Sequence, residues 1–143
     1  MSNSPLVSYT NLSPNKTSPR NHKIDTITIH CVVGQLTAKQ IVDLVKFQNY
    51  DAQNGSSCNY AVGTDGSIGL CVEESNRSWC TSSRSNDHRA ITIEVASDKT
   101  HPYAVNDKAY NALIELVADI CERNDIKELK WKANKDLIGK VDQ

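Results

Sequence analysis

The chain has 143 residues, which is the usual length of one domain. Its 16 lysine and arginine residues against 17 aspartate and glutamate residues leave a net charge of −1. Nucleic-acid-binding proteins carry a clustered basic excess, so this balance argues against a nucleic-acid partner. No apolar run approaches the ~18 residues that cross a bilayer, and residues 1–5 are polar. We therefore expect no membrane insertion, and synthesis in the cytoplasm without a signal peptide.

The first third of the chain predicts an arm, a strand and a helix. Residues 1–23 hold three of the four prolines among many serines and asparagines, which is typical of an arm lying over the rest of a protein. Residues 24–31 alternate and are β-branched, as in a strand. Thr37 and Gln40 have the spacing of a capping box and predict that a helix begins there. Its expected buried stripe is Ile41, Leu44, Val45 and Gln48.

The remaining elements follow from turn and cap signals. The runs 58–63 and 67–72 flank Asp65-Gly66, which predicts a hairpin. Residues 74–89 resemble a polar loop, and residues 90–96 another strand. Asn106 can cap a helix that ends near Arg123, and residues 127–132 resemble one more strand. The expected buried face of this helix is Tyr110, Leu113, Val117, Ile120 and Cys121. Such a mixture predicts an α/β or α+β sheet covered by helices.

Five cysteines are spread along the chain without a CxxC pair. They are Cys31, Cys58, Cys71, Cys80 and Cys121. The odd count and irregular spacing disfavour both a disulfide framework and a cysteine-only zinc site. We expect free thiols, as in a protein made in a reducing compartment.

Two strands share one pattern and carry the candidate functional residues. Alternate residues of a strand share a face, so Thr26–His30 and Ala90–Glu94 each have an isoleucine face and a polar face. With the isoleucines toward the helices, His30 and Glu94 project together from the opposite face. Such a titratable pair suits a hydrolytic site. A histidine at a strand end is also often structural, so the strands alone leave both interpretations open.

Four segments, in order, resemble a known family. They are Ile27-Thr-Ile-His30-Cys31, the hairpin Ser57–Ile68, Arg77-Ser-Trp79, and Asn86 followed by Ile91-Thr-Ile-Glu94-Val95. Together they resemble the zinc-dependent N-acetylmuramoyl-L-alanine amidases of the amidase-2 family, which is related to the peptidoglycan recognition proteins. The likeness is greatest to phage and prophage endolysins of Firmicutes and covers about residues 20–126.

The resemblance implies a central mixed β-sheet flanked by helices, with zinc in a groove on the sheet. It implies a peptidoglycan hydrolase that cleaves the amide bond between N-acetylmuramic acid and the L-alanine of the stem peptide. His30 would be a zinc ligand and Glu94 the catalytic glutamate, while Asn59 and Trp79 would line the substrate groove. Such an enzyme is made in the bacterial cytoplasm and acts on the cell wall after release.

The sequence also departs from the family pattern. The family's other two zinc ligands, a His and a Cys or Asp, are expected beyond Gln143. We therefore divide the chain into an arm, 1–23, and an amidase-type domain, 24–143, that is incomplete at its C-terminus. On this basis the 143-residue chain alone is expected to bind zinc poorly and to show little activity. Cys80 also stands where the neighbour of the tryptophan is often His.

Two other functions remain as alternatives. The first is a peptidoglycan-binding module of the same fold that has lost the metal. The presence of Glu94 favours an enzyme over such a module. The second is a cysteine hydrolase that uses Cys31 with a histidine, which strand alternation disfavours because the side chains of His30 and Cys31 point to opposite faces.

Overall fold

A computed structural model of the chain describes residues 2–47, 55–131 and 133–137. The helices are α1 (Ala38–Phe47), α2 (Arg84–Arg89) and α3 (Asp107–Arg123), and a 3₁₀ turn covers Lys135–Leu137. The strands are β1 (Tyr9–Thr10), β2 (Lys16–Thr17), β3 (Thr26–Cys31), β4 (Tyr60–Val62), β5 (Ile68–Leu70), β6 (Arg77–Ser78) and β7 (Ala90–Val95). No described helix is both long enough and apolar enough to cross a membrane.

The main sheet is mixed. Its five strands lie in the order β1-β5-β4-β7-β3, and β2 pairs separately with β6. β4 and β5 are antiparallel, whereas β1 with β5, β4 with β7 and β3 with β7 are parallel. The hairpin predicted around Asp65-Gly66 is confirmed, and Gly66 has the positive φ, 81°, that its turn requires.

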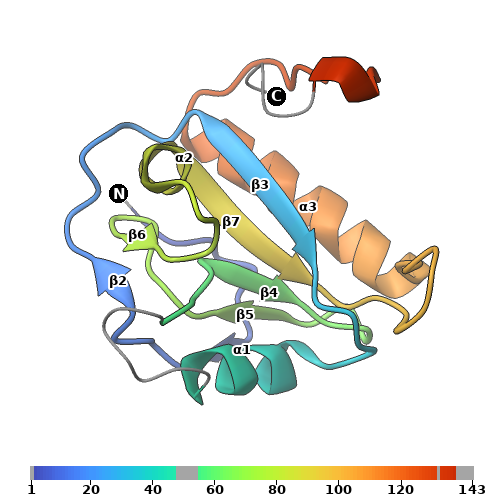
Figure 1. Cartoon of the computed structure of the whole chain (residues 1–143). Coiled ribbons are helices and arrows are strands. Elements are labelled where there is room, and N and C mark those ends of the chain that lie inside the picture. Colours follow the sequence, from blue (N-terminus) through green and yellow to red (C-terminus); the bar gives the residue numbers. More distant parts are fainter. Residues whose placement is uncertain (1, 48–54, 132, 138–143) are drawn as a thin grey trace.

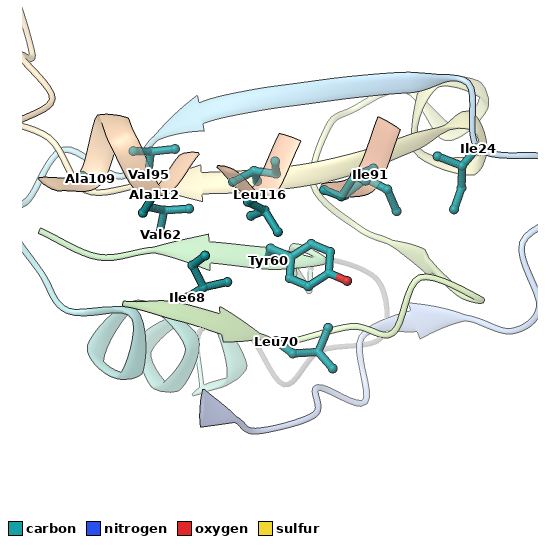
Figure 2. Close-up of a cluster of buried hydrophobic side chains, with 12 residues drawn as sticks. Ile24, Tyr60, Val62, Ile68, Leu70, Ile91, Val95, Ala109, Ala112 and Leu116 are labelled. Atoms are coloured by element: carbon teal, nitrogen blue, oxygen red, sulfur yellow. The ribbon is translucent and has the colours of Figure 1, made fainter. Parts of the chain in front are cut away.

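Helices cover both faces of the sheet, which confirms the predicted fold class. Isoleucine, valine and tyrosine side chains from β4, β5 and β7 form one core against α3 (Figures 1 and 2). α1 packs on the other face, over Ala61, Cys71 and their neighbours. Ile91 and Ile93 are buried toward α3 as predicted, while Ile29 is 50% exposed because β3 has only one neighbouring strand in the described sheet.

The predicted caps are confirmed, and so is the burial of Ile41 and Val45 in α1 and of Ile120 in α3, while other positions of each predicted face differ. The Thr37 amide donates to Gln40 Oε1, and the Gln40 amide donates to Thr37 Oγ1. In α1, Val42 is buried and Leu44 is 42% exposed; Gln48 lies outside the described residues.

Asn106 accepts a hydrogen bond from the Ala109 amide, as its N-cap role requires. The fully buried positions of α3 are Ala109, Ala112, Leu116 and Ile120. Tyr110 is instead 55% exposed, because the helix turns the neighbouring face, which carries Ala109 and Ala112, toward the sheet. Leu113, Val117 and Cys121 from the predicted face are partly buried.

Two segments differ from their predictions. Residues 127–131 form no strand, and Trp131 there is 76% exposed; Lys132 lies outside the described residues. Alternating lysines and apolar side chains resemble a strand, but no described strand pairs with them. The polar loop 74–89 contains β6 and α2, which the sequence analysis missed because both are short and polar.

The arm is part of the fold. β1 adds a strand to the main sheet, and the Ser4 amide donates to the Tyr60 hydroxyl. Arg20 is buried and donates to the backbone carbonyls of Glu74, Asn76, Asp87, His88 and Ala90. These bonds attach the arm to the turn before β6, to the end of α2 and to the start of β7.

Candidate active site

His30 and Glu94 lie side by side at the ends of neighbouring parallel strands. They are register partners in β3 and β7, and His30 Nδ1 is 3.4 Å from Glu94 Oε1. Both side chains project from the face that α1 covers, because Glu94 is in register with Ala61 of the α1 core. Strand alternation predicts that these two side chains lie together, and the structure agrees.

Cys80 joins this pair from a different part of the chain. Its Sγ lies 3.6 Å from His30 Nδ1 and 3.8 Å from Glu94 Oε1. It belongs to the loop between β6 and α2. No pattern in the sequence predicts a role for Cys80; the one signal is its position beside Trp79, where the family often has His.

Burial raises the pKa values of the two acids in this cluster. The pKa of Glu94 is raised by burial, against the opposing effects of His30 and Cys80. Burial, with a contribution from Glu94, raises the pKa of Cys80 to about 12. A carboxylate whose pKa moves toward neutrality is suited to accept and return a proton during hydrolysis.

The spacing of Cys80 and His30 also raises the question of a thiol nucleophile and its base. Cysteine nucleophiles are activated by a lowered pKa, and that of Cys80 is shifted in the opposite direction. Cys31, the nucleophile of the earlier alternative, is exposed and has no hydrogen bond to His30 among the described residues. The electrostatics therefore do not favour cysteine hydrolysis.

The cluster also has the composition of a metal site. One imidazole, one thiol and one carboxylate offer donor atoms that all lie within 4.8 Å of one another. These are the three side-chain types that bind zinc most often. The chain's own residues thus fit the metal that the family resemblance implies.

A pocket of about 240 Å³ opens beside the cluster. Glu94 and Cys80 line it together with Cys31, Val32, Leu44, Val45, Ser56 and Ser57. A larger pocket, of about 430 Å³, lies between β3 and α3 and is lined mainly by apolar side chains such as Ile29 and Val117. Because the titratable cluster borders the first pocket, that pocket is the candidate substrate site.

Trp79 lies next to Cys80 but borders a different pocket. This pocket, of about 210 Å³, is also lined by Arg77, Thr81 and Arg84. The indole Nε1 of Trp79 donates to Thr17 Oγ1 at 3.1 Å, so the arm fixes the ring. Trp79 is partly exposed and remains available to a ligand.

Asn59, the other residue predicted to line the substrate groove, is buried inside the fold. Its side chain is 0% exposed. Its amide donates to the carbonyl of Val72 at 3.1 Å, and its oxygen accepts from the amide of Thr92 at 3.1 Å. Asn59 thus links β7 to the segment after β5, and its contact with a substrate stays a prediction.

Comparisons with known proteins agree with this fold. No curated protein matches the chain. Among solved structures, a selenomethionine derivative of AmpD has a TM-score of 0.68 and 17% identity, over 86% of this chain and 78% of that one. PlyL has a TM-score of 0.65 and 18% identity, over 82% of this chain and 74% of the PlyL chain. The endolysin LysCS of Clostridium intestinale URNW has a TM-score of 0.62 and 17% identity, over 87% of this chain and 80% of the LysCS chain.

Drosophila peptidoglycan recognition protein SA is also similar, with a TM-score of 0.65 and 16% identity over 83% of this chain and 75% of that one. Identities this low establish the fold alone. The sequence itself, however, matches the N-acetylmuramoyl-L-alanine amidase family over residues 20–140, which is most of its length. With that match and the fold that accompanies it, the chain belongs to the N-acetylmuramoyl-L-alanine amidase family.

Proposed function

We propose that this protein is a zinc-dependent peptidoglycan amidase that separates N-acetylmuramic acid from the L-alanine of the stem peptide. The observation that carries the proposal is the cluster of His30, Cys80 and Glu94 beside a pocket, within the amidase fold. The similarity to an endolysin supports a phage or prophage origin in Firmicutes and action on the cell wall after release.

Within this proposal, His30 holds the metal and Glu94 moves the proton. Bound zinc would polarise the scissile carbonyl and lower the pKa of a coordinated water to about 7. The Glu94 carboxylate accepts a proton from the attacking water and then gives it to the amine of L-alanine as that group leaves. The raised pKa of Glu94 suits both steps, because the residue can hold the proton between them.

Substrate contacts follow from the pockets. The muramyl-peptide amide would lie in the pocket beside Glu94, whose wall is formed by Leu44 and Val45 of α1. The ring of Trp79 would contact the substrate beyond Cys80, at the neighbouring pocket.

The test is cleavage of purified cell walls. Gram-positive walls are incubated with the protein and zinc, and the soluble products are analysed by mass spectrometry. We expect stem peptides with a free L-alanine amino group, and muramic acid with an intact lactyl carboxylate. A chelator and the substitution His30→Ala should each abolish release. Wall binding without new amino termini would instead support the peptidoglycan-binding module, and new reducing ends would indicate a glycosidase.

A further inference from the structure

Cys80 has the position of a metal ligand. Two donors on one tetrahedral zinc, with bonds of about 2.3 Å to sulfur and about 2.0 Å to nitrogen, lie about 3.5 Å apart. The Cys80 Sγ and His30 Nδ1 atoms are 3.6 Å apart. Glu94 Oε1 lies on the same side of the sheet, 3.4 Å from the imidazole and 3.8 Å from the sulfur. An ion between these atoms would reach all three without a change of fold.

The backbone on both sides of Cys80 is held in place. On one side, the Ser57 amide donates to the Trp79 carbonyl and the Trp79 amide donates to Ser57 Oγ, each at 2.9 Å. On the other side, the carboxylate of Asp87 accepts from the Thr81 amide at 3.1 Å and from the Thr81 hydroxyl at 2.8 Å. Ser57 and Asp87 are both buried.

Asp87 also holds Cys80 itself. Its Oδ2 accepts from the Cys80 amide at 3.2 Å, so one buried carboxylate binds two consecutive backbone amides. The side chain is only 1% exposed. Metal sites bind more tightly when neighbouring groups fix their ligands in advance, and Asp87 has the contacts for this role.

We propose that Cys80 is a thiolate ligand of the metal in this protein, beside His30, and that Asp87 is the positioning residue that presents it. The proposal rests on the proposed function and deepens it by naming a ligand that lies between the tryptophan and the glutamate strand. Because Cys80 adds a donor within these 143 residues, the proposal replaces the expectation from the sequence that this chain alone binds zinc poorly. When the sulfur–metal bond forms, the thiol proton leaves to solvent. Glu94 lies beside both donors, and its carboxylate would be available to accept a proton from a water that the ion activates.

The experiment uses Co²⁺ as a spectroscopic probe and needs no substrate. Titration of the metal-free protein with Co²⁺ should produce a sulfur-to-cobalt charge-transfer band in the near ultraviolet, at about one ion per chain. Cys80→Ser should lose the band. Cys121→Ser is the matched control, because Cys121 lies on α3 and packs toward the opposite face, and it should keep the band. A band of unchanged intensity in Cys80→Ser would overturn the proposal.

A second measurement uses the unaltered chain. Zinc should protect one thiol from alkylation, and peptide mapping should locate the protection at Cys80, while Cys121 reacts equally with and without zinc. Equal alkylation of Cys80 in both conditions would contradict the proposed ligand.

Asp87→Asn tests the positioning role. We expect zinc affinity, measured by competition with a chelating dye, to fall about 10- to 100-fold. The Co²⁺ band should persist at saturating metal, because Cys80 itself remains. Unchanged zinc affinity would remove Asp87 from the proposal. None of these readouts depends on amide hydrolysis, so an inactive protein that shows the band would overturn only the proposed function.

Discussion

Two glutamates, Glu74 and Glu94, show how differently the same side chain can be surrounded: the first lies in a structural ion pair, and the second is the one for which we propose a catalytic role. Glu74 is 0% exposed and is surrounded by partners: Tyr60 Oη donates at 2.6 Å, and Arg123 donates through Nη2 at 2.6 Å and Nη1 at 3.0 Å. Glu94 is 18% exposed, and its partners are an imidazole and a thiol at 3.4 and 3.8 Å.

The difference lies in how completely the charge is compensated. A guanidinium and a hydroxyl offset the cost of burying Glu74, and this pair ties the segment after β5 to α3. Glu94 has no arginine or lysine ion pair among the described residues, so burial raises its pKa. A fully compensated carboxylate is inert, whereas a partly compensated one can exchange protons or bind a cation.

The sharpest way to separate the two glutamates is to neutralise Glu94. Glu94→Gln should lower the rate of stem-peptide release by about 10²–10⁴, the usual contribution of a general acid–base group. Thermal unfolding should change little, since Glu94 makes no strong ion pair. Release is measured by mass spectrometry of muropeptides, and Glu128→Gln, at an exposed position, serves as the control. Cell-wall lysis at the unaltered rate would end the catalytic assignment.

The opposite result is expected at the Glu74 pair. Arg123→Met removes the guanidinium and leaves the Glu74 carboxylate buried without its ion-pair partner. We expect the free energy of unfolding to fall by about 3–5 kcal/mol, measured by urea denaturation. Arg84→Met, at an exposed site, should change it by no more than about 0.5 kcal/mol. If Arg123→Met were as stable as the unaltered protein, the Glu74 pair would have no structural role.

These two sites also differ in how far the sequence predicts them. His30 and Glu94 follow from strand alternation, because two strands with the same pattern place their polar residues on one face when they pair in register. Glu74 follows from no such rule. It stands beside Glu73 in a polar run, and its burial depends on Arg123, far away in the sequence.

The contact between Cys80 and Asp87 is likewise not predicted by any local sequence pattern. Their meeting depends on the loop between β6 and α2, both of which are too short to leave a periodic signal. The buried faces of the helices are predicted only in part. Helical spacing of large apolar residues points to Tyr110 as a buried position, whereas α3 buries Ala109 and Ala112 and leaves Tyr110 exposed. Caps and the Gly66 turn are predicted well because they depend on neighbouring residues alone.

A smaller change beside Glu74 tests how much each of its two partners, Tyr60 and Arg123, stabilises the buried carboxylate. Tyr60→Phe keeps the ring in the core but removes the hydroxyl that donates to Glu74 and accepts from the Ser4 amide. Hydrogen bonds to charged groups contribute about 1.5–3 kcal/mol, so we expect a loss of unfolding free energy in that range. Measurement by urea denaturation should place Tyr60→Phe between the unaltered protein and Arg123→Met. A loss as large as that of Arg123→Met would make the hydroxyl, rather than the guanidinium, the main partner.

A third carboxylate, Asp43, lies near the surface, where hydrogen bonds from its neighbours stabilise its charge. Its removal should have the smallest effect on the free energy of unfolding. Hydrogen bonds from Lys39, Tyr9 and Asn11 lower the pKa of Asp43 to about 2, from an ordinary value of 3.8. The folded state therefore favours the ionised form. Its contribution to stability is complete above pH 3.8 and is lost as the pH falls toward 2.

Asp43→Asn should remove this contribution. The difference in unfolding free energy between the unaltered protein and Asp43→Asn should be constant from pH 7 to about pH 5 and should shrink below pH 4. Denaturant titrations at pH 3, 4, 5 and 7 measure it, with Glu115→Gln, at an exposed position of α3, as the control. A difference that grows as the pH falls would show that Asp43 is not held ionised by the arm and α1. In that case hydrogen bonds without burial would not suffice to hold a carboxylate in its charged form here.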